Sequence, residues 1–264
     1  RKITGSGMVT TVFRNSNFRS IQSVVSDNSN NLYVSDNSTS VIWKLTPSGN
    51  TYSGTVFAGS LNVRGNVDGT GSAARFNRPN GLAIDASDNI YVADGFNGAI
   101  RRITPSAEVS TIATLSAANG ERAIPFDIDI ASDGSIFASD NGQNVIVKVA
   151  AGSNTATTIL GTLNTSGSTD GQGSNARLDG PTGMVINNNT IYLASAINNS
   201  VREIDIDTNT ITTIAGPTNG SAGYVDGTGT AARFNNPLGI TIDASGALFM
   251  ADILNNSIRK IVFN

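Results

Sequence analysis

The sequence predicts an all-β protein, a β-propeller of five four-stranded antiparallel blades. A short strand pattern ending in Asp or Ser recurs five times in 264 residues, at intervals of 46 to 58 residues. Each copy lies in a unit of short strand-like segments separated by polar turns. The five copies end at Asp36, Asp94, Asp140, Ser195 and Asp252. Because one blade cannot bury both of its own faces, we predict that the repeats pack as a single domain over residues 1–264.

The second unit shows the plan of a blade most clearly. Four consecutive strands are expected, at 81–85, 90–94, 100–104 and 108–113. The segment ASDN at 86–89 is a turn between the first two. These first two strands are nearly continuous apolar runs, which is typical of strands that are covered on both faces.

Composition excludes several classes of protein. The net charge is −3 and no run of Lys and Arg occurs, which argues against a nucleic-acid partner. No apolar run reaches the length of a membrane span, so we expect no membrane insertion. The chain has no cysteine and therefore neither disulfides nor thiolate metal sites. Few charges and many Thr, Ser and Asn residues favour an exported bacterial protein.

Two long segments carry a family resemblance. FNRPNGLAIDASDNIYVADGFNGAIRRI (76–103) and FNNPLGITIDASGALFMADILNNSIRKI (234–261) resemble NHL repeats, the blades of a β-propeller family. The resemblance is to the bacterial, exported type and covers essentially the whole chain. The other units depart from the pattern at Thr39 and Trp43, at Gln143 and Val147, and at Ser195.

The two ends of the chain raise the question of how the last blade is completed. The chain ends in a third strand, SIRKI, whereas MVTTVF (8–13) reads as a fourth strand. We expect residues 8–13 to close the last blade. Residues 1–3 then duplicate 259–261, and this surplus strand is expected to hang free, to pair with a neighbouring chain in self-association, or to belong to a longer parent with six blades.

Three similar loops join successive units, and we call them the DG loops. They are VDGTGSAARFN (67–77), TDGQGSNARLD (169–179) and VDGTGTAARFN (225–235). In each, an Arg follows the Asp by seven residues, which predicts the pairs Asp68 with Arg75, Asp170 with Arg177, and Asp226 with Arg233. We expect structural loops in which Phe76, Leu178 and Phe234 plug between blades; the alternative is a cradle for a metal or phosphate.

Catalytic chemistry finds little support in the sequence. The chain contains no histidine, and the resemblance implies that related propeller lyases generally rely on histidine. The usual Ser-His and Cys-His nucleophile systems are also excluded. The calcium-like string DIDTNT (205–210) lacks the Gly and Glu that a calcium loop requires, so we interpret it as a turn. We therefore predict a protein that is not an enzyme.

Asp127 and Asp129 mark the third unit. Asp127 stands where the second, fourth and fifth units have Gly, and the period of two puts both carboxylates on one side of the innermost strand. Such a pair must be neutralised, bound to a cation or protonated. Either a cation such as Arg122 pairs them, or they form a site for a cation or polar ligand, with calcium the one cofactor considered.

The loops after the second strands form the predicted binding face. Their tips carry Phe96 with Asn97, Ile197 with Asn198, and Leu254 with Asn255. Apolar residues among polar ones are typical of partner-binding surfaces. The alternative is that each tip folds over its own blade and that the asparagines cap turns.

The leading interpretation is a non-catalytic binding or assembly module. It would engage protein or glycan through the loop-rich face, at an extracellular or cell-surface location. Two alternatives remain: a carboxylate- or calcium-dependent hydrolase or lyase, and a structural spacer or subunit of a surface protein or extracellular polymer.

Overall fold

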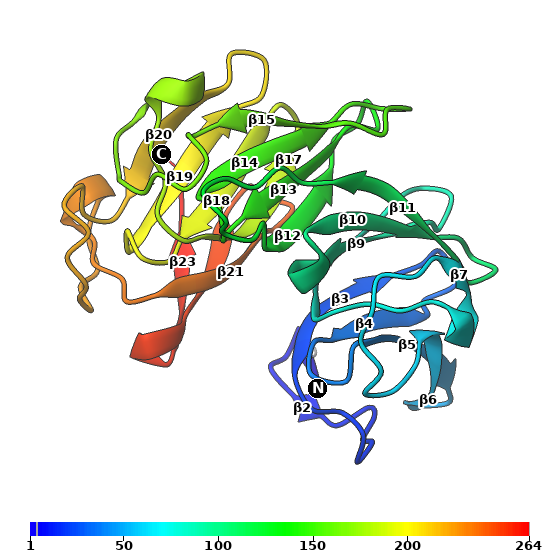
Figure 1. The fold of residues 1–264 in the computed structure, drawn as a ribbon. Helices are drawn as coiled ribbons and strands as arrows, with labels where there is room; N and C mark the ends of the chain where they lie inside the picture. The colour runs from blue at the N-terminus through cyan, green and yellow to red at the C-terminus, as the bar shows by residue number, and fades with distance from the viewer. Residues whose placement is uncertain (4, 264) are drawn as a thin grey trace. The chain divides into compact units, whose positions relative to one another are not determined.

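The computed structural model describes residues 1–3 and 5–263 of the chain. Apart from short 3-10 turns, the regular elements are β-strands that form five blade-like sheets and one two-stranded hairpin. The strands fall into two compact units, Arg1–Ile112 and Ala113–Asn264 (Figure 1). The predicted all-β class with five propeller blades is confirmed, and a single domain over the whole chain remains a prediction.

The N-terminal unit contains the hairpin and the first two blades. The first blade has the strand order β3-β4-β5-β6, and the second has β7-β11-β10-β9-β8. The strands are β1 (Lys2–Ile3), β2 (Val9–Thr10), β3 (Ile21–Ser26), β4 (Leu32–Asp36), β5 (Val41–Ser48), β6 (Thr51–Gly59), β7 (Gly69–Thr70), β8 (Pro79–Ile84), β9 (Ile90–Asp94), β10 (Ala99–Ile103) and β11 (Glu108–Thr114). The four strands predicted for the second unit thus agree with β8 to β11 within two residues.

The C-terminal unit contains the other three blades. Their strand orders are β12-β13-β14-β15, β16-β20-β19-β18-β17 and β21-β22-β23. The strands are β12 (Pro125–Ile130), β13 (Ile136–Asp140), β14 (Val145–Val149), β15 (Ala156–Leu160), β16 (Gly171–Gln172), β17 (Pro181–Asn187), β18 (Thr190–Ser195), β19 (Ser200–Asp205), β20 (Thr210–Ala215), β21 (Pro237–Ile242), β22 (Leu248–Asp252) and β23 (Ser257–Ile261). Among the described residues, the fifth blade therefore has three strands rather than four.

Single 3-10 turns lie in the DG loops and after two second strands. Their bounds are Gly71–Ala73, Gly95–Asn97, Gly173–Asn175, Gly229–Ala231 and Ile253–Asn255. None of the helices in the described part of the chain has the length and apolar character needed to cross a bilayer.

The prediction that residues 8–13 complete the last blade is wrong. β2 pairs antiparallel with β1, with Ile3 opposite Val9. Just beyond, the backbone N–H of Tyr52 on β6 donates to the carbonyl oxygen of Val12 at 2.9 Å. The connection between β1 and β2 is short, so the two strands pair at small entropic cost. The surplus strand thus pairs inside its own chain.

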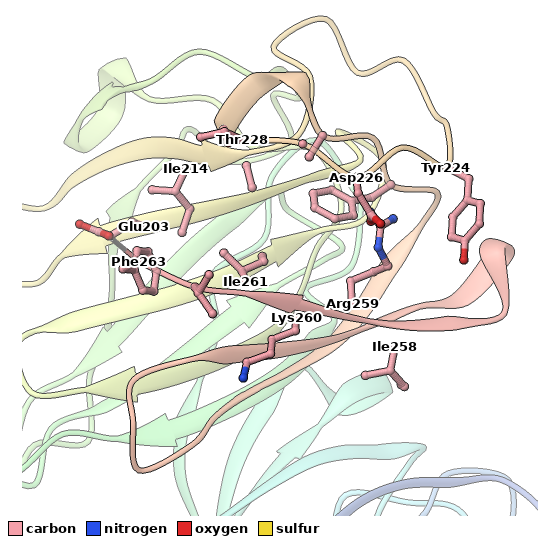
Figure 2. A pocket seen from close by; sticks show the side chains of 16 residues that line it. Glu203, Ile214, Tyr224, Asp226, Thr228, Ile258, Arg259, Lys260, Ile261 and Phe263 are labelled. Carbon is pink, nitrogen blue, oxygen red and sulfur yellow. The ribbon is translucent and has the colours of Figure 1, made fainter.

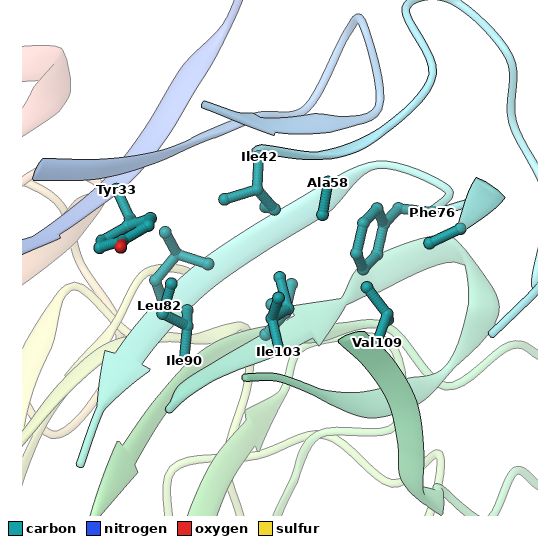
Figure 3. Close-up of a cluster of buried hydrophobic side chains, with 10 residues drawn as sticks. Tyr33, Ile42, Ala58, Phe76, Leu82, Ile90, Ile103 and Val109 are labelled. Atoms are coloured by element: carbon teal, nitrogen blue, oxygen red, sulfur yellow. The ribbon is translucent and has the colours of Figure 1, made fainter. Parts of the chain in front are cut away.

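Apolar side chains from neighbouring blades interlock within each unit. In the N-terminal unit, Tyr33 and Ile42 of the first blade pack with Leu82 and Ile90 of the second (Figure 3). Phe76, from the DG loop, is completely buried in the same cluster. This is the plug that the sequence predicted, and it accounts for the apolar first and second strands.

The C-terminal unit repeats this packing twice. Leu178, fully buried, lies in a cluster with Phe137 and Ile146 of the third blade and Ile191 of the fourth. Phe234, 2% exposed, lies in a cluster that joins the fourth and fifth blades. All three predicted loop plugs are therefore part of the core.

Candidate functional site

Arg101 on β10 lies fully buried at the centre of a polar cluster in the second blade. Its Nη2 is 2.6 Å from Oδ1 of Asp68 in the DG loop, and its Nη1 is 2.9 Å from Oδ2 of Asp94 at the end of β9. The two nitrogens also donate to the loop carbonyl oxygens of Arg75 and Val67. Arg101 therefore fastens the loop to the blade with charge-assisted hydrogen bonds.

The predicted pairing of each loop Asp with the Arg of its own loop is wrong. Asp68 pairs with Arg101, Asp170 with Arg202, and Asp226 with Arg259, at 2.6 to 2.7 Å. Arg75, Arg177 and Arg233 donate instead to backbone carbonyl oxygens of their own loops. The physical reason is that a guanidinium buried beneath the loop requires a carboxylate, whereas one at the surface is solvated.

A threonine on the fourth strand completes the cluster in the second and fourth blades. The backbone N–H and hydroxyl of Thr111 donate to Asp68 at 3.1 and 2.9 Å, and Thr213 donates to Asp170 in the same way at 3.0 and 2.9 Å. Burial acts to raise the pKa of Asp68, but the hydrogen bonds from Thr111 and Arg101 outweigh it and lower that pKa. Each carboxylate thus links a loop, a third strand and a fourth strand.

In the first and third blades, the arginine and the DG loop are missing together. Trp43 and Val147 stand at the arginine position. The buried Asp140 of the third blade accepts the backbone N–H groups of Ile124, Gly142 and Gln143 instead. Burial raises the pKa of Asp140 to about 6, although these three hydrogen bonds oppose the rise. The buried arginine and the DG loop therefore occur together, as one structural unit.

In the fifth blade the arginine and the DG loop are present, but the threonine that binds the loop aspartate is missing from the described residues. Nη1 of Arg259 lies 3.0 Å from the buried Asp252, and Nη2 lies 2.6 Å from Asp226. The side chain of Asp226 is 96% exposed, compared with 51% for Asp68 and 43% for Asp170. No threonine of the described chain donates to Asp226, because the fifth blade has no fourth strand there.

A groove of about 830 Å³ runs along β23, where a fourth strand would lie; we call it the β23 groove. Its walls include Ile214 at the end of β20, Phe234 from the DG loop and Ile261 on β23. Figure 2 shows the Arg259 side chain pointing toward Asp226 beside this strand. Tyr224 at the rim is 66% exposed. The groove therefore combines apolar and polar side chains, a strand edge and a partly satisfied carboxylate.

The acidic pair bridges two inner strands. Oδ2 of Asp127 accepts the N–H of Met184 at 2.9 Å, and Oδ2 of Asp129 accepts that of Ile186 at 2.7 Å, both on β17. The other oxygen of each accepts the N–H of the following residue. Burial raises the pKa of both carboxyls, to about 7 for Asp127, where Asp129 adds to the rise. Backbone N–H donors thus hold both carboxylates, and a cation at this pair stays a prediction.

The predicted loop tips differ from one another. Ile197 and Leu254, in the C-terminal unit, are 61% and 59% exposed. Phe96, in the N-terminal unit, is half-buried, and the guanidinium carbon of Arg78 lies 4.3 Å from its ring centroid. Nδ2 of Asn97 and of Asn255 donates to the buried Asp94 and Asp252, and Asn198 accepts the N–H of Asp179. The asparagines thus hold their loops, and a binding face formed by the tips stays a prediction.

Sequence reasoning missed Arg101, Arg202, Arg259 and the β23 groove. The signal for the arginines was present, since the units that carry a DG loop also carry Arg seven residues after the aligned Asp or Ser. The groove gave a weaker signal, because the sequence-based prediction placed residues 8–13 beside the third strand of the last blade.

The family match falls on the second blade. Residues 76–102 match the family model of the NHL repeat. The second blade is an NHL repeat. The chain is also similar to human NHL repeat-containing protein 2, at 27% identity over 209 residues, which is 77% of this chain and 23% of that protein. The protein SUPPRESSOR OF QUENCHING 1, chloroplastic, of Arabidopsis thaliana is 36% identical over 99 residues, 37% of this chain and 9% of its own length. The chain therefore spans less than a quarter of the length of these curated relatives.

Solved structures share the fold. An auxiliary nutrient binding protein from Bacteroides ovatus matches with a TM-score of 0.77 and 19% identity over 94% of this chain and 60% of that one. A catalytically inactive histidine-to-alanine variant of virginiamycin B lyase from Staphylococcus aureus matches with a TM-score of 0.66 and 18% identity, over 99% of this chain and 73% of that one. At these identities the likeness shows the fold alone.

Proposed function

We propose that this NHL-repeat chain is a non-catalytic binding or assembly module that accepts an extended protein segment along the β23 groove. The observation that carries the proposal is the fifth blade, which has three strands among the described residues and whose edge strand borders a groove lined by both apolar and polar side chains. An unpaired edge offers a row of N–H and C=O groups that a partner strand can pair with. Protein is favoured over glycan because a glycan has no main chain to continue the sheet.

A non-catalytic role has separate support. The lyase relative loses its activity when a histidine is replaced, and this chain has no histidine. The polar side chains of the blades hold loops and strands together, as Arg101 and Asp127 do. Incubation with a streptogramin B antibiotic should leave the compound intact; its ring opening would support the alternative of a lyase.

An extracellular or cell-surface location belongs to the same proposal. It is supported by the low content of charged residues, 14%, and by the fold shared with auxiliary nutrient binding proteins of Bacteroides. The loop tips Ile197 and Leu254 offer a further exposed apolar surface for a protein or glycan partner.

A direct test uses a labelled peptide of sequence TITTIAG, which reproduces the fourth strand of the fourth blade. Fluorescence anisotropy should show saturable binding to the full chain, and a scrambled peptide of the same composition should not bind. Asp226→Ala should weaken the binding at least tenfold, because it removes a charged acceptor. Binding that is equal for both peptides, or absent for both, overturns the proposal.

A further inference from the structure

The fourth blade shows what a strand in the β23 groove must look like. There, Arg202 on β19 stands opposite Thr213 on β20, Glu203 opposite Thr212, and Ile204 opposite Ile211. The N–H and hydroxyl of Thr213 donate hydrogen bonds to the carboxylate of Asp170. Ile211 is fully buried. A fourth strand for the fifth blade therefore needs a threonine opposite Arg259 and an aliphatic residue two positions earlier.

One segment of this chain has that sequence. Aligned with TITTIA (210–215) and with EVSTIA (108–113), the segment MVTTVF (8–13) places Thr11 on Thr213 and Thr111, and Val9 on Ile211 and Val109. Val109 and Ile211 are both buried in their blades. The segment thus supplies both side chains that the groove lacks, at the required spacing of two.

In its own chain the β2 part of this segment makes only a short pairing. β2 consists of two residues paired with the two residues of β1, and Val9 is 54% exposed. A pairing of this length is marginal in water. Exchange of the pairing with β1 is therefore of small cost for Val9 and Thr10, whereas the buried Val12 and the partly buried Phe13, which packs in the cluster around Trp43, must leave their places in the first blade.

We propose that residues 8–13 of one copy of this chain form the fourth strand of the fifth blade of a second copy. This inference rests on the proposed function of the β23 groove and names its occupant. Thr11 donates its N–H and hydroxyl to Asp226 of the other copy, Val9 packs against Ile214 and Ile261, and Thr10 stands opposite Lys260. The interaction makes the chain an assembly unit that joins copies by strand addition.

The absence of cysteine allows a direct test of this pairing. Thr10→Cys and Lys260→Cys are made as separate variants of the full chain, mixed, and oxidised. The proposal predicts a disulfide-linked heterodimer, because directly opposed residues of paired strands lie within disulfide distance. Met8→Cys mixed with Lys260→Cys is the out-of-register control and should link far less. No heterodimer above this control overturns the inference.

A double variant, Thr10→Cys with Lys260→Cys in one chain, distinguishes pairing between two copies from pairing within a single chain. Oxidation at low protein concentration should leave it unlinked if the strand comes from another copy. An internal disulfide in a monomer would mean that the strand docks within its own chain, which also overturns the inference.

Sedimentation equilibrium tests the chemistry of the contact. Thr11→Val should weaken association of the chain about tenfold, as expected for loss of a hydrogen bond to a charged group, whereas Thr10→Val should leave it unchanged. Equal effects of the two substitutions would contradict the role of Asp226. If the TITTIAG peptide binds but the chain stays monomeric and unlinked, the proposed function stands and this inference fails; if the peptide does not bind, the proposed function fails as well.

Discussion

Arg101 and Arg202 occupy the same position in two blades but neutralise different sets of charges. Arg101 lies between the half-exposed Asp68 and the buried Asp94. Arg202 has Asp170 alone, because Ser195 replaces the buried aspartate. Burial lowers the pKa of Arg202, and Asp170 opposes this effect. The two sites show how much of the cost of removing an arginine depends on the charge that is left behind.

Arg101→Met should destabilise the protein more than Arg202→Met. The first substitution leaves Asp94 buried without its cation, which costs about 3 kcal/mol, whereas the second leaves a carboxylate that water can reach, at about 1–2 kcal/mol. Urea unfolding of both variants measures the difference. Asp94→Ser added to Arg101→Met copies the fourth blade and should recover part of the loss; no recovery would show that the buried charge is not the cause.

The carboxyls of Asp127 and Asp129 predict an unusual pH dependence of stability. Burial raises the pKa of Asp127 to about 7 and also raises that of Asp129. A carboxyl with a raised pKa in the folded state holds its proton where the unfolded chain has lost it. Its contribution to the free energy of unfolding therefore falls as pH rises from about 4, the ordinary pKa, to about 7.

Thermal melts between pH 4 and pH 8 test this dependence. Asp127→Asn should reduce the fall in stability across that range, by up to about 1.4 kcal/mol per pH unit in the steepest part. Asp243→Asn is the matched control, since hydrogen bonds from Ser245 and Ala247 lower the pKa of Asp243 and confine its effect to lower pH. A stability that rises with pH over this range in the unmutated chain would contradict the argument.

At the scale of elements, the inner strands of neighbouring blades approach each other closely within the C-terminal unit. A Cβ atom on Gly183 of β17 would lie within 3 Å of the backbone of β21, whereas one on Gly239 of β21 would meet nothing within 4 Å. The glycine at this aligned position is thus required by packing in one blade and not in the other.

Gly183→Ala should therefore destabilise the protein by about 1–3 kcal/mol, the range for overpacking a core. Gly239→Ala should change stability by less than about 0.5 kcal/mol, because its site is open. A comparison of the melting temperatures of the two variants measures this difference in stability. Equal effects would show that β17 and β21 lie farther apart than the structure places them.

The elements also show what a sequence can and cannot predict. Strands β8 to β11 were predictable because short-range rules govern them: apolar alternation, Asp-rich turns and repetition. The partner of Asp68 was not, because Arg75 lies in the same loop seven residues away, while the true partner, Arg101, is on another strand. The place of residues 8–13 was also missed, since a strand pattern does not specify which edge it pairs with.

At the scale of the whole molecule, repetition predicted the fold class better than any single motif did. Five aligned units yielded five blades, and the plugs Phe76, Leu178 and Phe234 lie in the packed clusters between blades. Repetition could not predict the site, because a functional site in a repeat protein lies where the units differ. The fifth blade differs by its unpaired edge, and the third differs by its two aspartates.

Calcium binding distinguishes the two interpretations of those aspartates. All four carboxylate oxygens of Asp127 and Asp129 already accept backbone N–H groups. A calcium ion requires six to eight oxygen ligands, and no group of three or more acidic side chains with metal-binding geometry occurs in the described part of the chain. Millimolar calcium should therefore leave the melting temperature unchanged, because only a ligand that binds the folded state raises it. A saturable rise that disappears in Asp127→Asn with Asp129→Asn would restore the cation site and show that the inner strands separate enough to admit an ion.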